Sequence, residues 1–200
     1  MRIIAGERRG MKLLSPPGMD TRPVTDRVKE SIFNILYSSY GLPEGAKVGD
    51  VFSGTGSFGL EALSRGADCV TFVDMGKHVV EVLNKNIERA GYEDQSAVVC
   101  GNAFKSGAPV APGLDLYDLA FVDPPFPLTR ETDAKSQLGK MLFLMNSQII
   151  EGGLVLVRTH IRAVLDESYG GLKVIDRREW GTMAETFLRL EQSAESDIDE

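Results

Sequence analysis

The sequence Asp123-Pro124-Pro125-Phe126 combines groups that can activate an amine. It directly follows the apolar run 119–122, which predicts a buried strand. The prolines stiffen the backbone, so the Asp123 carboxylate and the Pro124 carbonyl can present two acceptors to one planar amino group. Accepting both N–H bonds frees the nitrogen lone pair for attack on a methyl carbon, and Phe126 can stack on the base. We therefore predict catalytic roles for Asp123, Pro124 and Phe126 in methylating a nucleobase amine, although a plain Pro-Pro turn is the alternative for this motif alone.

A glycine-rich loop lies earlier in the chain, between a predicted strand and a predicted helix. Ser53 begins it, and Gly54, Gly56 and Gly59 match the spacing G-x-G-x-x-G. Asp74 ends the next predicted strand, at about the ~20-residue spacing of the dinucleotide fingerprint. Glycines let a ligand approach the backbone, and the carboxylate can accept from ribose hydroxyls. The loop predicts an adenosine-containing cofactor, but it does not separate NAD from S-adenosylmethionine.

Three further features favour S-adenosylmethionine. Asp50 precedes the glycines at a position where acids recur in methyltransferases, near the methionine end of the cofactor. Asn102 and Ala103 follow the third predicted strand, where that fold usually meets the adenine edge. The strand-end motif that begins with Asp123 is one that dehydrogenases do not use there. Met75 is expected either to pack on adenine or to make an ordinary apolar contact.

The N-terminal region is basic within an acidic chain. The whole chain carries a net charge of −7, whereas residues 1–30 contain seven basic and four acidic side chains, a local +3 (7 − 4). Residues 2–5 and 11–14 predict a hairpin with arginines at its tip. Such an arm is compatible with RNA binding, and a solvated charged face is the alternative. The predicted RNA-binding residues are Arg2, Arg8, Arg9, Lys12 and Arg22.

The elements that must position these motifs alternate between strands and helices. Thr25 or Asp26 can cap a first helix that ends near Gly41. The predicted strands are 47–52, 69–74, 96–100, 117–122, 153–158, 172–178 and 184–190; the predicted helices are 57–65, 77–90, 132–147 and a short one near 161–167. Apolar strands alternating with amphipathic helices predict an α/β fold, a parallel sheet covered on both faces. A terminal hairpin added to such a sheet is the arrangement of the seven-stranded, Rossmann-like methyltransferase fold.

Length and composition predict one globular domain with small appendages. The chain has 200 residues, of which 42% are hydrophobic and 26% charged. We expect an N-terminal arm over 1–22, a methyltransferase domain over 23–191 and a mobile acidic tail over 192–200. No apolar run approaches the length of a membrane span and no signal peptide is evident, so we expect a cytoplasmic protein without membrane contact, and a monomer.

The cysteines and histidines predict neither a disulfide nor a metal site. Cys69 and Cys100 each lie in an apolar, strand-like run, so we expect buried free thiols. His78 and His160 have no partner at metal-ligand spacing.

The motifs together resemble the bacterial RsmD family, which methylates the N2 amine of a guanine in 16S ribosomal RNA. The resemblance extends to about Leu190 and rests on the segments 2–6, 9–10, 22–30, 50–56, 59–67 and 122–126. It implies a class I methyltransferase fold, S-adenosylmethionine as cofactor, and ribosomal RNA of the small subunit, or of an assembly intermediate, as partner. It also implies that Thr25, Asp26 and Arg27 lie close to the methionine end of the cofactor. Asp74 is one methylene shorter than the family's usual Glu, and the segment 158–160 departs from the family.

Two other classes of function remain open at this point. A DNA adenine-N6 or protein glutamine-N5 methyltransferase uses a related strand-end motif, but such enzymes usually carry Asn at the position of Asp123. A non-catalytic RNA-binding assembly factor could keep the fold. The intact Asp123 and glycine loop argue against that alternative.

Overall fold

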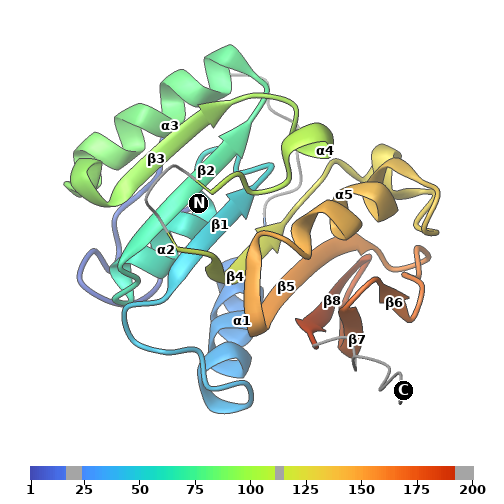
Figure 1. The fold of residues 1–200 in the computed structure, drawn as a ribbon. Helices are drawn as coiled ribbons and strands as arrows, with labels where there is room; N and C mark the ends of the chain where they lie inside the picture. Colours follow the sequence, from blue (N-terminus) through green and yellow to red (C-terminus); the bar gives the residue numbers. More distant parts are fainter. Residues whose placement is uncertain (17–23, 111–114, 192–200) are drawn as a thin grey trace, which may run out of the picture.

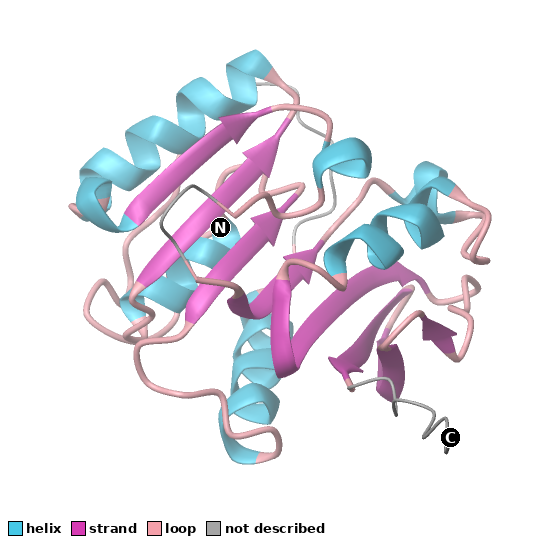
Figure 2. Ribbon diagram, in the orientation of Figure 1, coloured by secondary structure: helices cyan, strands magenta, loops and turns pink. Residues whose placement is uncertain are grey.

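The computed structural model describes residues 1–16, 24–110 and 115–191, which form one mixed sheet with helices on both sides (Figures 1 and 2). The strand order is β3-β2-β1-β4-β5-β8-β7-β6. Strands β1 to β5 are parallel to one another. Strand β8 is antiparallel to β5, and β7 is antiparallel to β8. The strands are β1 (Lys47–Val51), β2 (Cys69–Asp74), β3 (Ser96–Cys100), β4 (Tyr117–Val122), β5 (Ile149–His160), β6 (Ser168–Tyr169), β7 (Leu172–Trp180) and β8 (Met183–Leu190).

Two apolar layers cover the faces of this sheet. The helices are α1 (Asp26–Ser38), α2 (Ser57–Ser64), α3 (Lys77–Ala90), α4 (Ala103–Ser106) and α5 (Gln137–Met145), with short 3₁₀ turns η1 (Glu93–Gln95) and η2 (Phe126–Thr129). Phe33 of α1 contacts Phe58 and Phe121 in the layer beneath α1, α2 and α3. Leu138 and Met141 of α5 lie in the opposite layer. Strand residues alternate between the two layers because successive side chains point to opposite faces.

The predicted α/β architecture is confirmed, and the differences from the predicted elements are local. The helix expected near 161–167 is wrong: Ala163 donates to the His160 carbonyl in a turn, and Thr132 donates to the Val164 carbonyl at 2.5 Å. Helix α5 begins at Gln137 instead of 132, because Ser136 caps it by accepting from Gly139 at 3.0 Å. A two-residue strand, β6, extends the sheet beyond the seven strands expected.

The N-terminal segment reverses direction as predicted but packs into the body of the protein. Arg2 and Lys12 form a single antiparallel bridge instead of two strands. Ile3 is fully buried and Leu13 is 7% exposed, and the Glu7 amide donates to the Ser64 carbonyl of α2 at 2.7 Å. The segment therefore covers one end of α2, which limits how much of it can reach a partner. Arg22 and the acidic tail 192–200 lie outside the described residues.

Neither a disulfide nor a membrane-spanning helix nor a metal-binding cluster is found in the described residues. Cys69 is partly buried and Cys100 is exposed, so the expectation of two buried thiols is wrong for Cys100. No helix in the described ranges is long and apolar enough to cross a bilayer. Within the same ranges, no three His, Cys, Asp or Glu side chains are grouped so as to hold a metal ion.

Candidate active site

The carboxyl ends of β1, β2, β3 and β4 meet at one edge of the sheet (Figure 1). The backbone continues to pair just beyond the strands: Ser53 donates to the Val73 carbonyl at 3.0 Å, and Asp123 donates to the Val51 carbonyl at 3.1 Å. This edge is where open α/β sheets bind ligands. The glycine loop and the Asp-Pro-Pro-Phe motif are therefore neighbours across β1 and β4.

The backbone of the glycine loop is strained at its start. Phe52 has a φ of 62° and is the one non-glycine residue with positive φ among those that the structure describes. Its ring packs edge-on against Phe104 of α4, with the centroids 4.9 Å apart. Gly54 follows with a φ of 54°, which glycine adopts without cost. Such strain persists only where surrounding structure imposes it, and it is typical of ligand-binding turns.

The predicted ribose acceptor, Asp74, is fixed by the backbone around it. Its two carboxylate oxygens accept from the amides of Gly54 at 3.0 Å and Gly76 at 2.9 Å. Each oxygen keeps a lone pair for a ligand hydroxyl. Met75 is 70% exposed beside it, an unusual state for a large apolar side chain, and is available to cover a flat ring. Asn102 is used structurally, because its side chain caps α4 by accepting from Phe104 at 3.0 Å.

The loop offers both space and unused polar atoms to a cofactor. A Cβ added at Gly54 would meet no atom within 4 Å. The hydroxyl oxygens of Ser53 and Thr55 are buried without a hydrogen-bond partner in the described part of the chain. Buried polar groups are rarely left unpaired, so these two hydroxyls indicate a ligand or ordered water at the loop. The residues present therefore fit S-adenosylmethionine.

The other two glycines of the loop serve packing. A Cβ at Gly56 would come 2.6 Å from Leu83 of α3, and one at Gly59 would come 2.3 Å from the Phe72 ring of β2. Gly56 therefore lets the loop approach α3, and Gly59 lets α2 approach the sheet. Their predicted contact with the cofactor stays a prediction. The amide of Gly59 also donates to the Asp50 carboxylate at 2.8 Å.

Asp50 lies at the end of β1 beneath the loop. Its side chain is 1% exposed, and burial raises the pKa of its carboxyl to about 8, against the opposing effect of the Gly59 amide. A cationic group bound above it would favour the ionised form.

The start of α1 lies beside the glycine loop. Thr25 caps the helix by accepting from Val28 at 3.4 Å, and Asp26 pairs with Arg2 at 2.6 Å, while Arg27 is exposed. One turn later, the Lys29 ammonium donates to the Ser57 carbonyl at 3.2 Å, which links α1 to the first residue of α2. The structure describes no contact between Thr25, Asp26 or Arg27 and the glycine loop, so their place beside the cofactor stays a prediction.

A buried ion cluster that sequence reasoning missed holds this region together. Glu61 of α2 is fully buried and accepts from Lys29 at 3.1 Å and from Arg65 at 2.8 Å. It also accepts from the amides of Ile4 at 2.7 Å and Ala5 at 3.0 Å. The sequence did contain a sign of this cluster: Lys29 in α1 and Glu61 in α2 are charged residues at helical positions that face the core.

The catalytic candidate Asp123 has a charged partner that the sequence did not indicate. Arg158 of β5 donates from its Nε to Asp123 Oδ1, and its guanidinium lies 5.9 Å from the centroid of the Phe126 ring. The two side chains of the ion pair are 18% and 13% exposed. Burial raises the pKa of the Asp123 carboxyl, and Arg158 opposes that effect. The ion pair therefore favours an ionised Asp123 and leaves Oδ2 for another donor.

A buried acid, Glu185, also lies near Arg158. Glu185 of β8 stands opposite Arg158 in the antiparallel register, so both side chains lie on the same face of the sheet. Glu185 is 3% exposed and its Oε1 has no hydrogen-bond partner among the described residues. Burial raises the pKa of Glu185 to about 8, with Arg158 opposing. The Arg158 guanidinium thus pairs with Asp123 and also favours the ionised form of Glu185.

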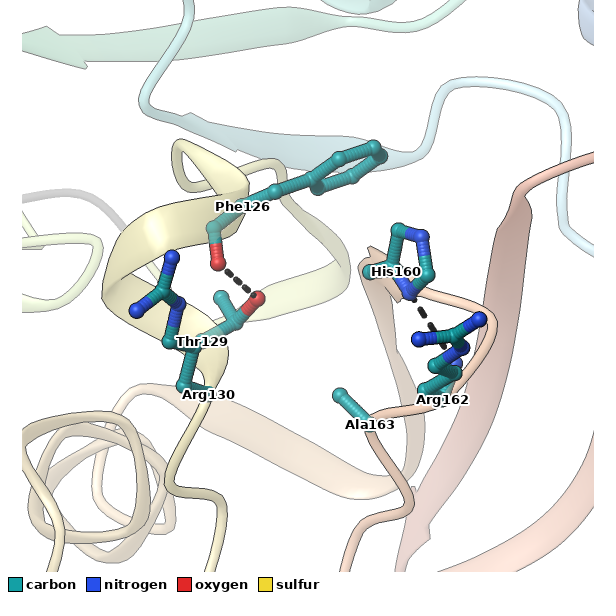
Figure 3. Close-up of a pocket in the computed structure, with 6 residues that line it drawn as sticks. All are labelled: Phe126, Thr129, Arg130, His160, Arg162 and Ala163. Atoms are coloured by element: carbon teal, nitrogen blue, oxygen red, sulfur yellow. Dashed lines mark hydrogen bonds between the residues drawn. The ribbon is translucent and has the colours of Figure 1, made fainter.

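An open pocket of about 390 Å³ continues from the Asp-Pro-Pro-Phe motif (Figure 3). Its walls come from η2 and from the turn after β5, and the lining residues are Phe126, Thr129, Arg130, His160, Arg162 and Ala163. Phe126 and His160 meet edge to face with their ring centroids 5.9 Å apart. The pocket was not predicted, because its two walls are far apart in the sequence.

The predicted RNA-binding residues differ in exposure and in whether their charge is already paired. Arg8 is half-buried: its Nε donates to the Ala90 carbonyl at 2.6 Å, and its guanidinium lies 5.5 Å from the Tyr92 ring centroid. Arg9 and Lys12 are exposed, whereas Arg2 is paired with Asp26. Arg9 and Lys12 are therefore the described members of the set with the most accessible charge.

Comparison with known proteins relates this chain to one family over most of its length. The family model described as conserved hypothetical protein 95 matches residues 1–189. Ribosomal RNA small subunit methyltransferase D of Escherichia coli is 31% identical over 207 residues, covering 100% of this chain and 94% of that protein. The putative rRNA methyltransferase YlbH of Bacillus subtilis is 31% identical over 183 residues, covering 90% of this chain and 94% of that protein.

Solved structures share the fold. The putative methyltransferase yhhF from Escherichia coli superimposes with a TM-score of 0.76 at 30% identity, over 96% of this chain and 98% of that one. The putative methylase HI0767 from Haemophilus influenzae gives a TM-score of 0.72 at 27% identity, over 96% of this chain and 98% of that one. The predicted class I methyltransferase architecture is thereby confirmed.

Proposed function

Because the chain belongs to the family of conserved hypothetical protein 95, the RsmD family of ribosomal RNA methyltransferases, we propose that it methylates the exocyclic N2 amine of a guanine in small-subunit ribosomal RNA. The proposed methyl donor is S-adenosylmethionine. The observation that carries the proposal is the adjacency of two motifs: Asp123 pairs with Val51 immediately before the glycine loop, at the ligand-binding edge of the sheet.

The proposed cofactor site is the glycine loop and the strand ends beside it. The unpartnered hydroxyls of Ser53 and Thr55 and the open space at Gly54 support binding of a polar ligand there. Asp74 is proposed to accept from the ribose hydroxyls, and Met75 to cover the adenine ring. Bound S-adenosylmethionine would supply an electrophilic methyl group at this edge.

The proposed role of Asp123 is to orient and activate the amine. Its free Oδ2, together with the Pro124 carbonyl, would accept the two N–H bonds of the amino group, while Phe126 holds the base by stacking. As the nitrogen bonds to carbon it becomes positive, and an ionised carboxylate stabilises that charge most strongly in the transition state. Asp123 can then accept the proton that the methylated amine loses.

The direct test is transfer of labelled methyl from S-adenosylmethionine to small ribosomal subunits that lack the modification, followed by mapping of the labelled base. We expect one labelled guanine, at N2. DNA and protein acceptors are tested in parallel, and label on adenine in DNA, or on a protein glutamine, would instead support a related amine methyltransferase. No transfer to any of the three would support a non-catalytic RNA-binding factor.

Asp123→Asn tests the assigned role, because it keeps the shape and one acceptor but removes the charge. We expect turnover to fall by about a hundredfold or more, as for loss of one preorganised electrostatic partner, while calorimetry shows unchanged affinity for S-adenosylmethionine. The matched variant Asp74→Ala should do the reverse and lower cofactor affinity by about one to two decades. Parallel loss of affinity and turnover in Asp123→Asn would contradict the assignment of Asp123 to the amine side.

A further inference from the structure

We infer that the pocket beside Phe126 binds the ribose and phosphate of the nucleotide next to the target guanine, with Arg130 and Arg162 on the phosphate (Figure 3). The inference rests on the proposed function, because a neighbouring nucleotide exists only if the target base belongs to a nucleic acid. It adds the residues that recognise the strand beyond the target base itself.

The charge in the pocket is positive and uncompensated. Arg130 follows η2 and Arg162 follows β5, and Figure 3 shows them on opposite walls of the same hollow. Both are exposed, and neither side chain forms an ion pair with any described residue. In a chain of net charge −7, two guanidiniums without a described ion-pair partner, one from each wall of the same pocket, indicate an anionic ligand. Guanidinium groups match phosphate oxygens in geometry as well as in charge.

The location of the pocket links that anion to the target base. Phe126 belongs both to the Asp-Pro-Pro-Phe motif and to the pocket lining, so a ligand in the pocket lies next to a base held by the motif. The volume, about 390 Å³, is within the roughly 300–1,000 Å³ of small-ligand sites and suits a single nucleotide. A free metabolite with a phosphate would satisfy the arginines but would not need this shared wall.

His160 supplies a donor suited to a ribose hydroxyl. Its Nδ1 accepts from the amide of Arg162 at 3.2 Å, so the neutral ring carries its proton on Nε2. The ring stands edge-on to Phe126 in the pocket wall, with Ala163 leaving space beside it. A 2′-hydroxyl both donates and accepts, and it is the group by which proteins distinguish RNA from DNA. The pocket is therefore assigned to a ribonucleotide.

The two histidines of this chain allow a direct measurement. His160 lines the pocket, whereas the side chain of His78 is 94% exposed on α3, the helix that packs against β3 and β2. The full chain is labelled selectively at histidine and titrated with a guanine-containing RNA trinucleotide while both ring signals are followed by NMR. We expect the His160 signal, assigned with His160→Gln, to shift to saturation and the His78 signal to stay in place. The DNA trinucleotide should bind more weakly.

Arginine variants test the phosphate contact in the same titration. Arg130→Ala combined with Arg162→Ala should weaken trinucleotide binding by about tenfold or more and reduce the salt dependence of log Kd by about one. Lys85→Ala combined with Arg89→Ala removes the same charge from the exposed face of α3 and should leave both quantities unchanged. Equal effects of the two pairs would overturn a specific phosphate site and show only a general charge effect.

The outcomes separate this inference from the proposed function. If the protein methylates guanine N2 but its His160 signal does not shift with RNA, only the pocket assignment is wrong. A protein whose His160 responds to RNA, with the response lost in the arginine pair, but which transfers no methyl group would overturn the proposed chemistry and keep the pocket. If inorganic phosphate shifts the His160 signal to saturation at the same concentration as the trinucleotide, the pocket binds a simple anion and the nucleotide assignment is wrong.

Discussion

At the scale of single residues, the partly buried ion pair between Asp123 and Arg158 is the main feature of the site. A carboxylate with 18% of its side chain exposed loses much of its hydration, and burial alone favours the protonated form. A protonated Asp123 could accept from an amine less well and could not stabilise a positive nitrogen. Arg158 thus supports the form of Asp123 that the proposed chemistry requires, and its guanidinium also lies 5.9 Å from the centroid of the Phe126 ring.

Replacement of Arg158 should change the pH dependence of turnover. In Arg158→Gln the Asp123 carboxyl loses the cation that opposes its raised pKa, so turnover with ribosomal RNA should fall at neutral pH and recover as pH rises. Arg158→Lys keeps the charge and should retain a profile closer to that of the parent protein. The test is to measure turnover as a function of pH for the parent protein, Arg158→Gln and Arg158→Lys. A uniform loss at every pH would mean that Arg158 serves only packing.

Glu185 should make stability depend on pH. Its folded pKa of about 8 lies above its ordinary 4.5, so the native state holds a proton that the unfolded chain releases between these values. Its contribution to the free energy of unfolding therefore falls as pH rises from about 4.5 to about 8. Relative to the parent protein, Glu185→Gln should gain stability progressively across that window in urea unfolding. Glu88→Gln, a change in an exposed side chain of α3, is the matched control; a constant difference for Glu185→Gln would contradict the prediction.

At the scale of elements, the turn from β1 into α2 divides its glycines between two tasks. Gly54 faces open space at the ligand edge, whereas Gly59 lies against Phe72 on the sheet side of α2. Both glycines belong to the same sequence pattern. They differ only in what a Cβ at each position would meet.

Alanine at each position should separate the two tasks. Gly54→Ala places a side chain where the cofactor is proposed to approach, so cofactor affinity should fall while the left-handed φ of 54° costs about 1–2 kcal/mol of stability. Gly59→Ala forces a contact at 2.3 Å and should cost about 1–3 kcal/mol, with affinity retained by the folded protein. Calorimetry and urea unfolding measure both quantities. Equal loss of affinity in the two variants would argue against this division.

At the scale of the whole molecule, charge is distributed unevenly over an acidic chain. The net charge of −7 repels nucleic acid overall, so binding must rely on local positive groups. The described candidates are Arg9 and Lys12 on the N-terminal segment and the arginine pair in the pocket. The N-terminal segment packs against the ends of α2 and α3, whereas the pocket lies between η2 and the turn after β5.

Two adjacent arginines of the N-terminal segment should differ in effect. Arg9→Ala removes an exposed charge and should weaken RNA binding and lower its salt slope by about one, with no loss of stability. Arg8→Ala removes the bond to the Ala90 carbonyl and the contact with Tyr92, so it should cost about 1–2 kcal/mol of unfolding free energy. Filter binding at several salt concentrations and urea unfolding check these outcomes. Unchanged RNA binding in Arg9→Ala would make the segment purely structural.

The positions of the strands along the chain and the class of chemistry could be predicted from sequence alone because they depend on local patterns. Apolar runs separated by amphipathic helices define parallel strands, and β2, β3 and β4 were predicted with the bounds that the structure shows. The glycine loop and the Asp-Pro-Pro-Phe motif are contiguous, so each could be recognised without knowing what lies beside it. Their meeting at one edge follows from the parallel arrangement of the strands.

The partners of those motifs could be decided only by the tertiary structure. Arg158 is 35 positions from Asp123 in the chain, and nothing local indicates that β5 brings them together. The same holds for Glu185 opposite Arg158, for the two walls of the pocket, and for Glu61 with Lys29. Local sequence determines which segments form strands and helices, because periodicity and turn residues act over a few positions. Which charged side chain is buried against which other depends on the register between strands, and register is a property of the assembled sheet.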